Sequence, residues 1–179
     1  MKKIDDLILI EFKKFEDERG FFEIVFDSSC DLLSNFNIKF VQLNRSFSKT
    51  SKTLRGLHFQ RYPHAQAKFV TCVKGAIYDV VIDIRPDSNT FGLWNCFELN
   101  ANSQTGLFIP KGFAHGFMTL SNTAEFLYKT TDYYSPDHEC SIHWNDSSIG
   151  IKWPITTTNP ILSLKDNTAP EVAGVEIFQ

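Results

Sequence analysis

The sequence predicts an all-β protein, a β-sandwich or barrel with a few short helices. Short runs rich in β-branched and aromatic residues recur at near-regular spacing, turn-forming residues separate them, and helical periodicity is almost absent. The chain has 179 residues, enough for one domain with a sizeable core. No internal repeat or linker divides it, so we expect a single domain over residues 1–179.

The N-terminal part predicts two strands, at Leu7–Phe12 and Phe21–Phe26, joined by a turn at Asp17–Gly20. Ser28–Asn37 could form a short helix, and Phe40–Phe47 is expected to be extended.

The stretch Thr53–Val70 predicts two paired strands joined by a Pro-containing turn. The dipeptide Lys74-Gly75 is a hairpin signal, and the β-branched run Ala76–Ile84 predicts the next strand. The remaining predicted strands are Trp94–Leu99, Gly106–Ile109, Gly116–Leu120 and Glu125–Thr131. The last segment, Pro154–Gln179, is expected to wrap the surface or to pack beside the barrel mouth.

Composition narrows the class of partner. Eighteen Lys and Arg against 21 Asp and Glu give a net charge of -3, which argues against nucleic acid or an anionic membrane. A local basic pocket for a small phosphorylated ligand stays possible. The four cysteines form no Cys-x-x-Cys pair, and no apolar run has the length of a signal peptide core or a membrane span. We therefore expect a cytoplasmic protein with free thiols.

Titratable and amide side chains are concentrated in Thr53–Val70 among apolar residues. Burying such groups costs free energy unless each is paired or used, so the stretch is either a functional site or two polar-edged strands. Asp79 and Asp83 share one face of the following run, and Asp79 is the better site candidate because its strand is otherwise so apolar. The polar residues of the stretch are Arg55, His58, Gln60, His64, Gln66 and Lys68.

The segment Pro110–His115 (PKGFAH) matches the second half of the cupin signature, Pro-x-Gly-x-x-His. In metal cupins this histidine is a ligand, and the first half of the signature supplies His-x-His and a glutamate. Here the corresponding residues are His58-Phe59-Gln60, with no second histidine. A divalent metal needs three or more convergent ligands, so the sequence predicts a cupin jelly-roll barrel without a metal.

Further segments, in order along nearly the whole chain, make the sequence resemble the dTDP-4-dehydrorhamnose 3,5-epimerase family of cupins. They are DERGFF (17–22), FVQ (40–42), LRGLHFQ (54–60), AQAK (65–68), YDVVIDIR (78–85), IPKGFAHGF (109–117), AEFLYK (124–129), YYSP (133–136), Glu139, WND (144–146), IKWP (151–154) and SLKD (163–166).

The resemblance implies 3,5-epimerisation of a nucleotide-linked 4-keto-6-deoxy sugar, with no metal or redox cofactor. Carbons 3 and 5 flank the ketone, so enolate formation acidifies their protons. The reaction needs a base, an acid on the opposite face of the ring, and a cation or donor at the ketone oxygen.

Four residues match the family's catalytic positions. His58 would be the base, because an imidazole with a pKa near ~6.5 accepts a proton at neutral pH, and Asp166 would orient it. Tyr128 would be the acid, and Lys68 would stabilise the oxyanion.

Other residues match positions that contact the substrate. By strict alternation Arg55 falls on the strand face opposite His58, but a bulge at Gly56 could turn it inward. Arginine suits the diphosphate because it binds in a bidentate way. Arg19 is expected to reach the nucleotide, and Tyr133 and Tyr134 could either stack on the substrate or only pack. The remaining contact positions are Gln42, Asn44, His115, Glu139 and Lys165.

Two departures from the family pattern leave the substrate open. Ile24 and Leu43 stand where relatives carry Glu and Asp, in the nucleotide or sugar pocket. A GDP-linked 4-keto heptose and epimerisation at carbon 3 alone therefore remain alternatives.

Two further readings belong to other functional classes. One is a metal-dependent cupin oxygenase that uses His58, His64 and His115. The other is a non-catalytic module that binds a sugar nucleotide. The resemblance also implies a homodimer whose N-terminal strands reach across to the partner.

Overall fold

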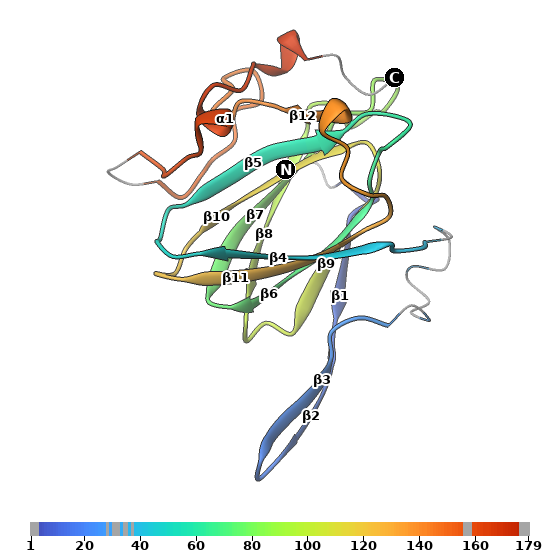
Figure 1. Ribbon diagram of the computed structural model, residues 1–179, viewed down its shortest axis with the longest axis vertical. Helices are drawn as coiled ribbons and strands as arrows, with labels where there is room; N and C mark the ends of the chain where they lie inside the picture. Colours follow the sequence, from blue (N-terminus) through green and yellow to red (C-terminus); the bar gives the residue numbers. More distant parts are fainter. Residues whose placement is uncertain are drawn as a thin grey trace.

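Two antiparallel five-stranded sheets face each other in the computed structural model (Figure 1). The first sheet has the strand order β1-β9-β6-β11-β4 and the second has β12-β5-β10-β7-β8. The structure describes residues 4–27, 29, 33, 36, 38–155 and 159–175. This arrangement confirms the predicted all-β sandwich of the cupin type, and the helices within the described residues are short turns.

The element bounds agree with most of the predicted strands. The first sheet consists of β1 (Ile8–Glu11), β4 (Gln42–Ser48), β6 (Lys68–Lys74), β9 (Thr105–Ile109) and β11 (Ala124–Thr130). The second consists of β5 (Leu54–Gln60), β7 (Ala76–Asp83), β8 (Trp94–Asn100), β10 (Phe113–Thr119) and β12 (Glu139–Ser141). A separate hairpin, β2 (Lys13–Asp17) and β3 (Gly20–Ile24), projects from the body of the molecule (Figure 1). The helical turns are η2 (Pro136–His138), α1 (Leu164–Asn167) and η3 (Val172–Gly174).

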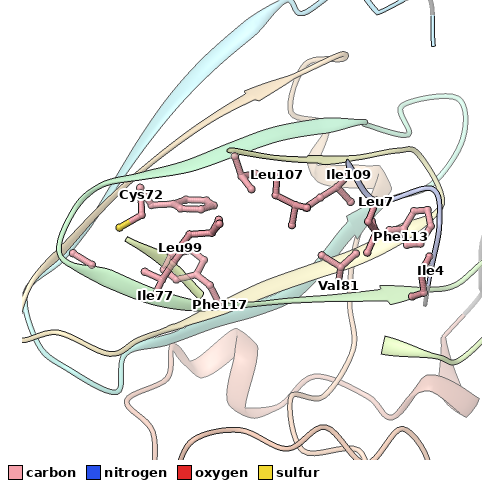
Figure 2. Packing of buried hydrophobic residues seen from close by; sticks show 13 residues of the cluster. Ile4, Leu7, Cys72, Ile77, Val81, Leu99, Leu107, Ile109, Phe113 and Phe117 are labelled. Carbon is pink, nitrogen blue, oxygen red and sulfur yellow. The ribbon is translucent and has the colours of Figure 1, made fainter. Parts of the chain in front are cut away.

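The main core lies between the two sheets (Figure 2). In β7, Ile77 and Val81 point into this core, whereas Val80 and Ile82 point to the outer face of the second sheet. The C-terminal segment covers that outer face and contributes, among others, Trp153 to it. Both faces of β7 are therefore buried, which explains why its sequence is so apolar. Val172 and Val175 of the C-terminal segment pack on the same outer face, as expected for this part of the chain.

One predicted connection is wrong. Gly75 does form a tight turn, with φ +74°, and a side chain there would lie 2.1 Å from the carbonyl oxygen of Thr123. The strands on either side of it are not a hairpin, because β6 pairs with β9 and β11 whereas β7 pairs with β8 and β10. The turn instead carries the chain from one sheet to the other.

A second connection between the sheets, from β5 to β6, corrects the expected pairing within Thr53–Val70. β5 pairs with β10 and β12 in the second sheet, and β6 belongs to the first. His58 and Lys68 therefore meet across the interior and not along one sheet. The helix expected over Ser28–Asn37 lies outside the continuously described residues, as does Cys30.

The other three cysteines, Cys72, Cys96 and Cys140, are free thiols. None of the helices in the described part of the chain is long and apolar enough to cross a membrane.

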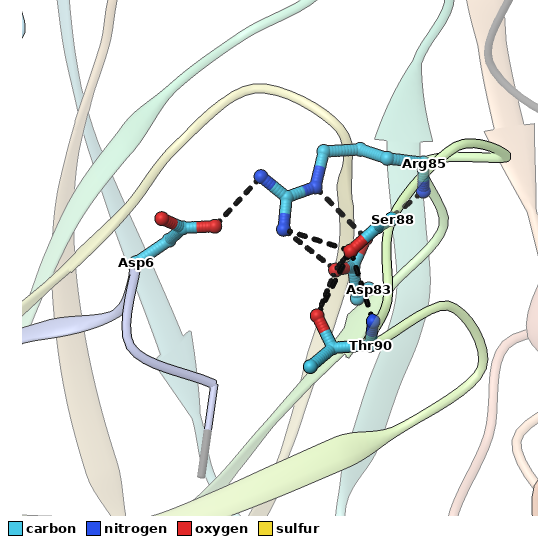
Figure 3. A network of polar contacts seen from close by, with 5 residues as sticks. All are labelled: Asp6, Asp83, Arg85, Ser88 and Thr90. Carbon is cyan, nitrogen blue, oxygen red and sulfur yellow. Dashed lines mark hydrogen bonds and ion pairs between the residues drawn. The ribbon is translucent and has the colours of Figure 1, made fainter.

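Asp83 holds the turn after β7 and the N-terminal segment together (Figure 3). Its fully buried carboxylate accepts hydrogen bonds of 2.6 Å from Arg85 Nη2, Ser88 Oγ and Thr90 Oγ1. Arg85 Nη1 in turn lies 2.7 Å from Asp6 Oδ2. Burial raises the pKa of Asp83, but these hydrogen bonds outweigh it and lower the pKa below its ordinary value.

Replacing Asp83 by Asn should destabilise the fold by about 2 kcal/mol, because it weakens charge-assisted hydrogen bonds to a buried group. A carboxylate whose pKa is lowered in the folded state stabilises above its unfolded pKa of about 4, and this contribution is lost as the pH falls. Thermal unfolding should therefore show Asp83→Asn melting below the wild type at neutral pH, with the difference shrinking below about pH 4. A difference that does not change with pH would contradict the assignment.

Candidate active site

A cavity of about 340 Å³ opens between the sheets. Its walls come from both sheets and from α1, so residues far apart in the sequence converge there. Eight of the predicted site residues line it: Arg55, His58, Lys68, His115, Tyr128, Glu139, Lys165 and Asp166.

His58 and Asp166 form a close pair in this cavity. Nε2 of His58 lies 2.6 Å from Oδ1 of Asp166, whose side chain is 5% exposed. The backbone N–H of Asp166 donates to the Oγ of Ser163, the N-cap of α1, so the short helix positions the carboxylate. Figure 1 shows α1 close to β5, the strand that carries His58. Burial raises the pKa of Asp166, but hydrogen bonds from His58 and Ser163 outweigh it and lower the pKa. Asp166 is thus an anion at neutral pH that can orient the imidazole ring.

Tyr128 faces the same cavity from the opposite sheet. It lies on β11 beside Asn44 of β4, whereas His58 lies on β5 of the second sheet. Burial raises the pKa of Tyr128, and the charge of Arg55 only partly opposes this. The phenol therefore remains protonated at neutral pH and faces a histidine across a shared hollow.

Lys68 enters the cavity from β6. Its Nζ donates a long hydrogen bond, 3.4 Å, to the carbonyl oxygen of His58. Burial lowers the pKa of Lys68 to about 8, while the negative charges of Asp79 and Glu139 oppose this fall. At pH 7 most of the side chain is still an ammonium ion.

Arg55 reaches the cavity through a register shift in β5. His115 pairs with His58 and Phe117 pairs with Arg55, so Gly56 and Leu57 together stand opposite a single residue of β10. A side chain at Gly56, whose φ is +115°, would lie 2.6 Å from the Cα of its neighbour on β10. The bulge suggested by the glycine is therefore present, and Arg55 lines the cavity.

Charged groups also form the rim. Oε2 of Glu139 lies 2.5 Å from Lys165 Nζ and accepts a hydrogen bond of 2.8 Å from the Tyr134 hydroxyl. Burial raises the pKa of Glu139, but these two partners outweigh it and lower the pKa. Of the two tyrosines whose roles the sequence left open, Tyr134 lines the cavity, whereas Tyr133 is 64% exposed and does not.

Three predicted contact residues do not line the cavity of this chain. Gln42 and Asn44 are hydrogen-bonded to each other at 2.6 Å, on the face of β4 that also carries the cavity residue Ser46. Arg19 lies in the turn at the tip of the β2–β3 hairpin, which projects from the two sheets (Figure 1), and it pairs with Asp17 at 2.6 Å.

Residues that sequence reasoning did not assign also line the cavity. Ser46 could have been found from its alternation with Asn44 on the same face of β4. Phe126 packs its ring against that of His115, with centroids 6.0 Å apart, and is hard to distinguish from a core residue by sequence. The other lining residues without an assigned role are Phe59, Gln60, Gln66, Gly116, Phe117, Tyr134 and Ser163.

His64 is not among the lining residues. Its Nδ1 lies 3.3 Å from Oδ2 of Asp132, and its ring packs against His138 with centroids 4.6 Å apart. The histidine triad required by the oxygenase reading is therefore not assembled. Within the described residues no group of three or more His, Cys, Asp or Glu side chains could hold a metal ion.

The whole chain is similar to proteins of one family. A family model described as dTDP-4-dehydrorhamnose 3,5-epimerase matches residues 1–174. The dTDP-4-dehydrorhamnose 3,5-epimerase of Salmonella typhimurium is 52% identical over 168 residues, which cover 93% of this chain and 91% of that protein. The Escherichia coli enzyme of the same name is 49% identical over 165 residues, which cover 92% and 88%.

Solved structures agree with these sequence matches. The dTDP-4-dehydrorhamnose 3,5-epimerase of Bacillus anthracis, with TDP and PPi bound, superposes with a TM-score of 0.90 at 42% identity, covering 96% of this chain and 97% of that one. The dTDP-6-deoxy-D-glucose-3,5-epimerase of Legionella pneumophila, in complex with dTDP-4-keto-L-rhamnose, gives a TM-score of 0.91 at 42% identity, covering 98% and 92%. The chain therefore belongs to the dTDP-4-dehydrorhamnose 3,5-epimerase family of isomerases.

Proposed function

We propose that this protein epimerises carbons 3 and 5 of a dTDP-linked 4-keto-6-deoxy sugar, without a cofactor. The observation that carries the proposal is that His58 and Tyr128 face one cavity from opposing sheets, with the Lys68 ammonium beside them. Such an arrangement can hold a sugar ring with a base on one face and an acid on the other.

The reaction then follows from the chemistry of the three side chains. His58 takes the proton from the carbon beside the ketone, and the electron pair of that C–H bond moves to the C4 oxygen as an enolate. Because Asp166 occupies Nε2 of His58, the proton would be taken by Nδ1. Asp166 stabilises the resulting imidazolium, and the Lys68 ammonium stabilises the enolate oxygen.

Tyr128 completes the inversion by donating its proton to the opposite face of the same carbon. The phenolate regains a proton and the imidazolium loses one through solvent. Two such rounds, at carbons 3 and 5, give the doubly inverted product with no net change in protons or electrons.

The substrate-contact roles form the second part of the proposal. Arg55 and Lys165 supply positive charge toward the diphosphate, and His115 and Glu139 supply polar contacts to the sugar. Gln42 and Asn44 extend the same polar face along β4. A dTDP-linked sugar is preferred to a GDP-linked heptose because the relatives described above are named for dTDP sugars or hold TDP.

We also propose a homodimer in which the β2–β3 hairpin of one chain reaches the other. An isolated two-stranded hairpin is only marginally stable in water, and this one exposes three aromatic rings. They belong to Phe15, Phe21 and Phe22, exposed by 59%, 63% and 66%. Arg19 at the hairpin tip would then approach the nucleotide in the partner's cavity. Reduced thiols at Cys72, Cys96 and Cys140 support a cytoplasmic location for this single-domain enzyme.

Removing the arginine at the hairpin tip tests this arrangement. Arg19→Ala should raise KM for the sugar nucleotide by about tenfold with little change in kcat, because a charged contact to the nucleotide is lost while the acid–base groups stay. Steady-state kinetics would measure both constants, and Lys14→Ala, on the same hairpin, is a control for general weakening. An unchanged KM would remove Arg19 from the site.

Deuterium wash-in tests the proposed activity as a whole. A dTDP-linked 4-keto-6-deoxy sugar and its GDP-linked counterpart would be incubated separately with the enzyme in heavy water. We expect deuterium at carbons 3 and 5 of the dTDP sugar by mass spectrometry. Exchange at carbon 3 alone would mean that the protein is a monoepimerase. Faster exchange with the GDP-linked sugar would mean that the natural substrate carries GDP and not dTDP. Binding without exchange would mean that the protein is a non-catalytic module.

A further inference from the structure

A second histidine–carboxylate pair joins the cavity wall, where His115 lies, to Asp79 behind it. Nε2 of His115 is 2.8 Å from Oδ2 of Asp79, and the two side chains are 7% and 0% exposed. The other carboxylate oxygen of Asp79, Oδ1, is buried and has no hydrogen-bond partner within the described residues. A buried carboxylate oxygen without a partner is costly, so its position calls for an explanation.

In the part of the chain that the structure describes, Lys68 is a buried donor group with too few acceptors, whereas Asp79 has an acceptor oxygen without a donor. Its ammonium has three N–H donors, yet within the described residues it makes a single hydrogen bond, the 3.4 Å contact to the His58 carbonyl. A buried ammonium ion without a counter-ion tends to lose its proton. In that form it could not stabilise an oxyanion.

Titratable groups of the neighbouring elements share the cavity with Lys68 or act on its charge, and within the described residues three of them are carboxylates. Asp166 is engaged by His58, and Glu139 is engaged by Lys165 and Tyr134. Asp79 is the carboxylate that keeps an oxygen without a partner in the described structure. These groups are Asp79 on β7, Glu139 on β12, Arg55 and His58 on β5, His115 on β10, Tyr128 on β11, Lys165 and Asp166 on α1, and Tyr134 before η2.

We propose that Asp79 is a positioning residue for the epimerisation, whose buried carboxylate is the counter-ion that keeps Lys68 an ammonium ion inside the cavity. The inference rests on the role proposed above for Lys68. Asp79 itself does not line the cavity, so it acts through Lys68 and not on the substrate.

The electrostatics of the cluster agree with this geometry. Burial lowers the pKa of Lys68, and the charge of Asp79 is the larger of the two that oppose the fall. Burial raises the pKa of Asp79, and the charges of His115 and Lys68 oppose that rise. Contacts place the two groups near each other: Lys68 donates to the carbonyl oxygen of His58, His58 stands opposite His115 in the register of β5 and β10, and His115 holds Asp79. Opposite charges so placed each favour the charged form of the other.

The pH profile of Asp79→Asn tests the counter-ion directly. Asparagine keeps an oxygen that can accept from His115 but removes the charge. An opposite charge nearby typically shifts a pKa by one unit or more, so the alkaline limb of kcat against pH should move down by at least about one unit. Just above the displaced limb, kcat should fall about tenfold relative to the wild type.

Asp83→Asn is the matched control, because Asp83 is a fully buried carboxylate on the same face of β7 whose partners lie outside the cavity. It should lower the melting temperature without moving the alkaline limb. In a Lys68→Arg background the Asp79→Asn substitution should no longer shift the limb, because a guanidinium stays charged without a counter-ion. A shift of the same size in both backgrounds, or none in either, would overturn the inference.

A double-mutant cycle, measured by thermal unfolding, covers the case in which Asp79→Asn does not fold. Lys68→Met removes the ammonium ion, so the charge of Asp79 no longer has an ammonium ion to stabilise. The melting temperature of the double variant Lys68→Met/Asp79→Asn should therefore fall by less than the sum of the decreases in the two single variants, or the double variant should fold where Asp79→Asn alone does not. Additive losses, or a double variant that also fails to fold, would contradict the coupling between the two charges. If Lys68→Met itself keeps full activity, the role of Lys68 in the proposed function fails, independently of Asp79.

Discussion

Replacing His58 by Asn is expected to abolish deuterium exchange at both carbons and to lower kcat by about a thousandfold or more. Acid–base catalysis typically contributes 10²- to 10⁴-fold, and His58 is the proposed base for both positions. Asparagine is the better test than alanine, because an amide can still donate to Asp166, whose side chain is 5% exposed. A loss of activity would then be due to the missing base, and not to destabilisation by an unpaired carboxylate at Asp166.

His64→Asn is the matched control for this experiment. His64 is also next to a carboxylate, Asp132, but it does not line the cavity. Its replacement should leave exchange at both carbons close to the wild-type rate. Activity of His58→Asn within tenfold of the wild type would mean that another group is the base.

The strands themselves were predictable because their signal is local. Runs such as Ala76–Ile84 alternate between two faces, and glycine or proline marks their ends. The partner of each strand was not predictable in the same way. Lys74-Gly75 has the chemistry of a hairpin turn, yet β6 and β7 lie in different sheets, because hydrogen-bonding partners far along the chain decide the pairing.

The candidate site shows the same division. His58 and Gln60 share a strand face by period two, and Gly56 signals the bulge that brings Arg55 to the cavity. The sequence could not show which of the adjacent residues Tyr133 and Tyr134 lines the cavity. The structure shows that Tyr134 donates to Glu139, and this contact is not visible in a local pattern. Nor could the sequence show that Asp79 pairs with His115, since that contact depends on the register between β7 and β10.

Arg19 illustrates a limit of a different kind. Its position in the DERGFF segment predicted a nucleotide contact, yet within one chain it lies at the tip of the projecting hairpin (Figure 1). The sequence places the residue in a turn, but a local pattern carries no information about which surface, if any, this turn meets.

Replacing Tyr128 by Phe should separate proton removal from inversion. His58 would still remove the proton and could return a deuteron to the same face, so recovered substrate should carry deuterium while product formation falls about a hundredfold. Mass spectrometry of substrate and product in heavy water measures both processes. Tyr133→Phe is the control, because this neighbouring tyrosine is 64% exposed and lies outside the cavity. If Tyr128→Phe forms product at the wild-type rate, the acid must be another group, and Tyr134, which also lines the cavity, is the next candidate.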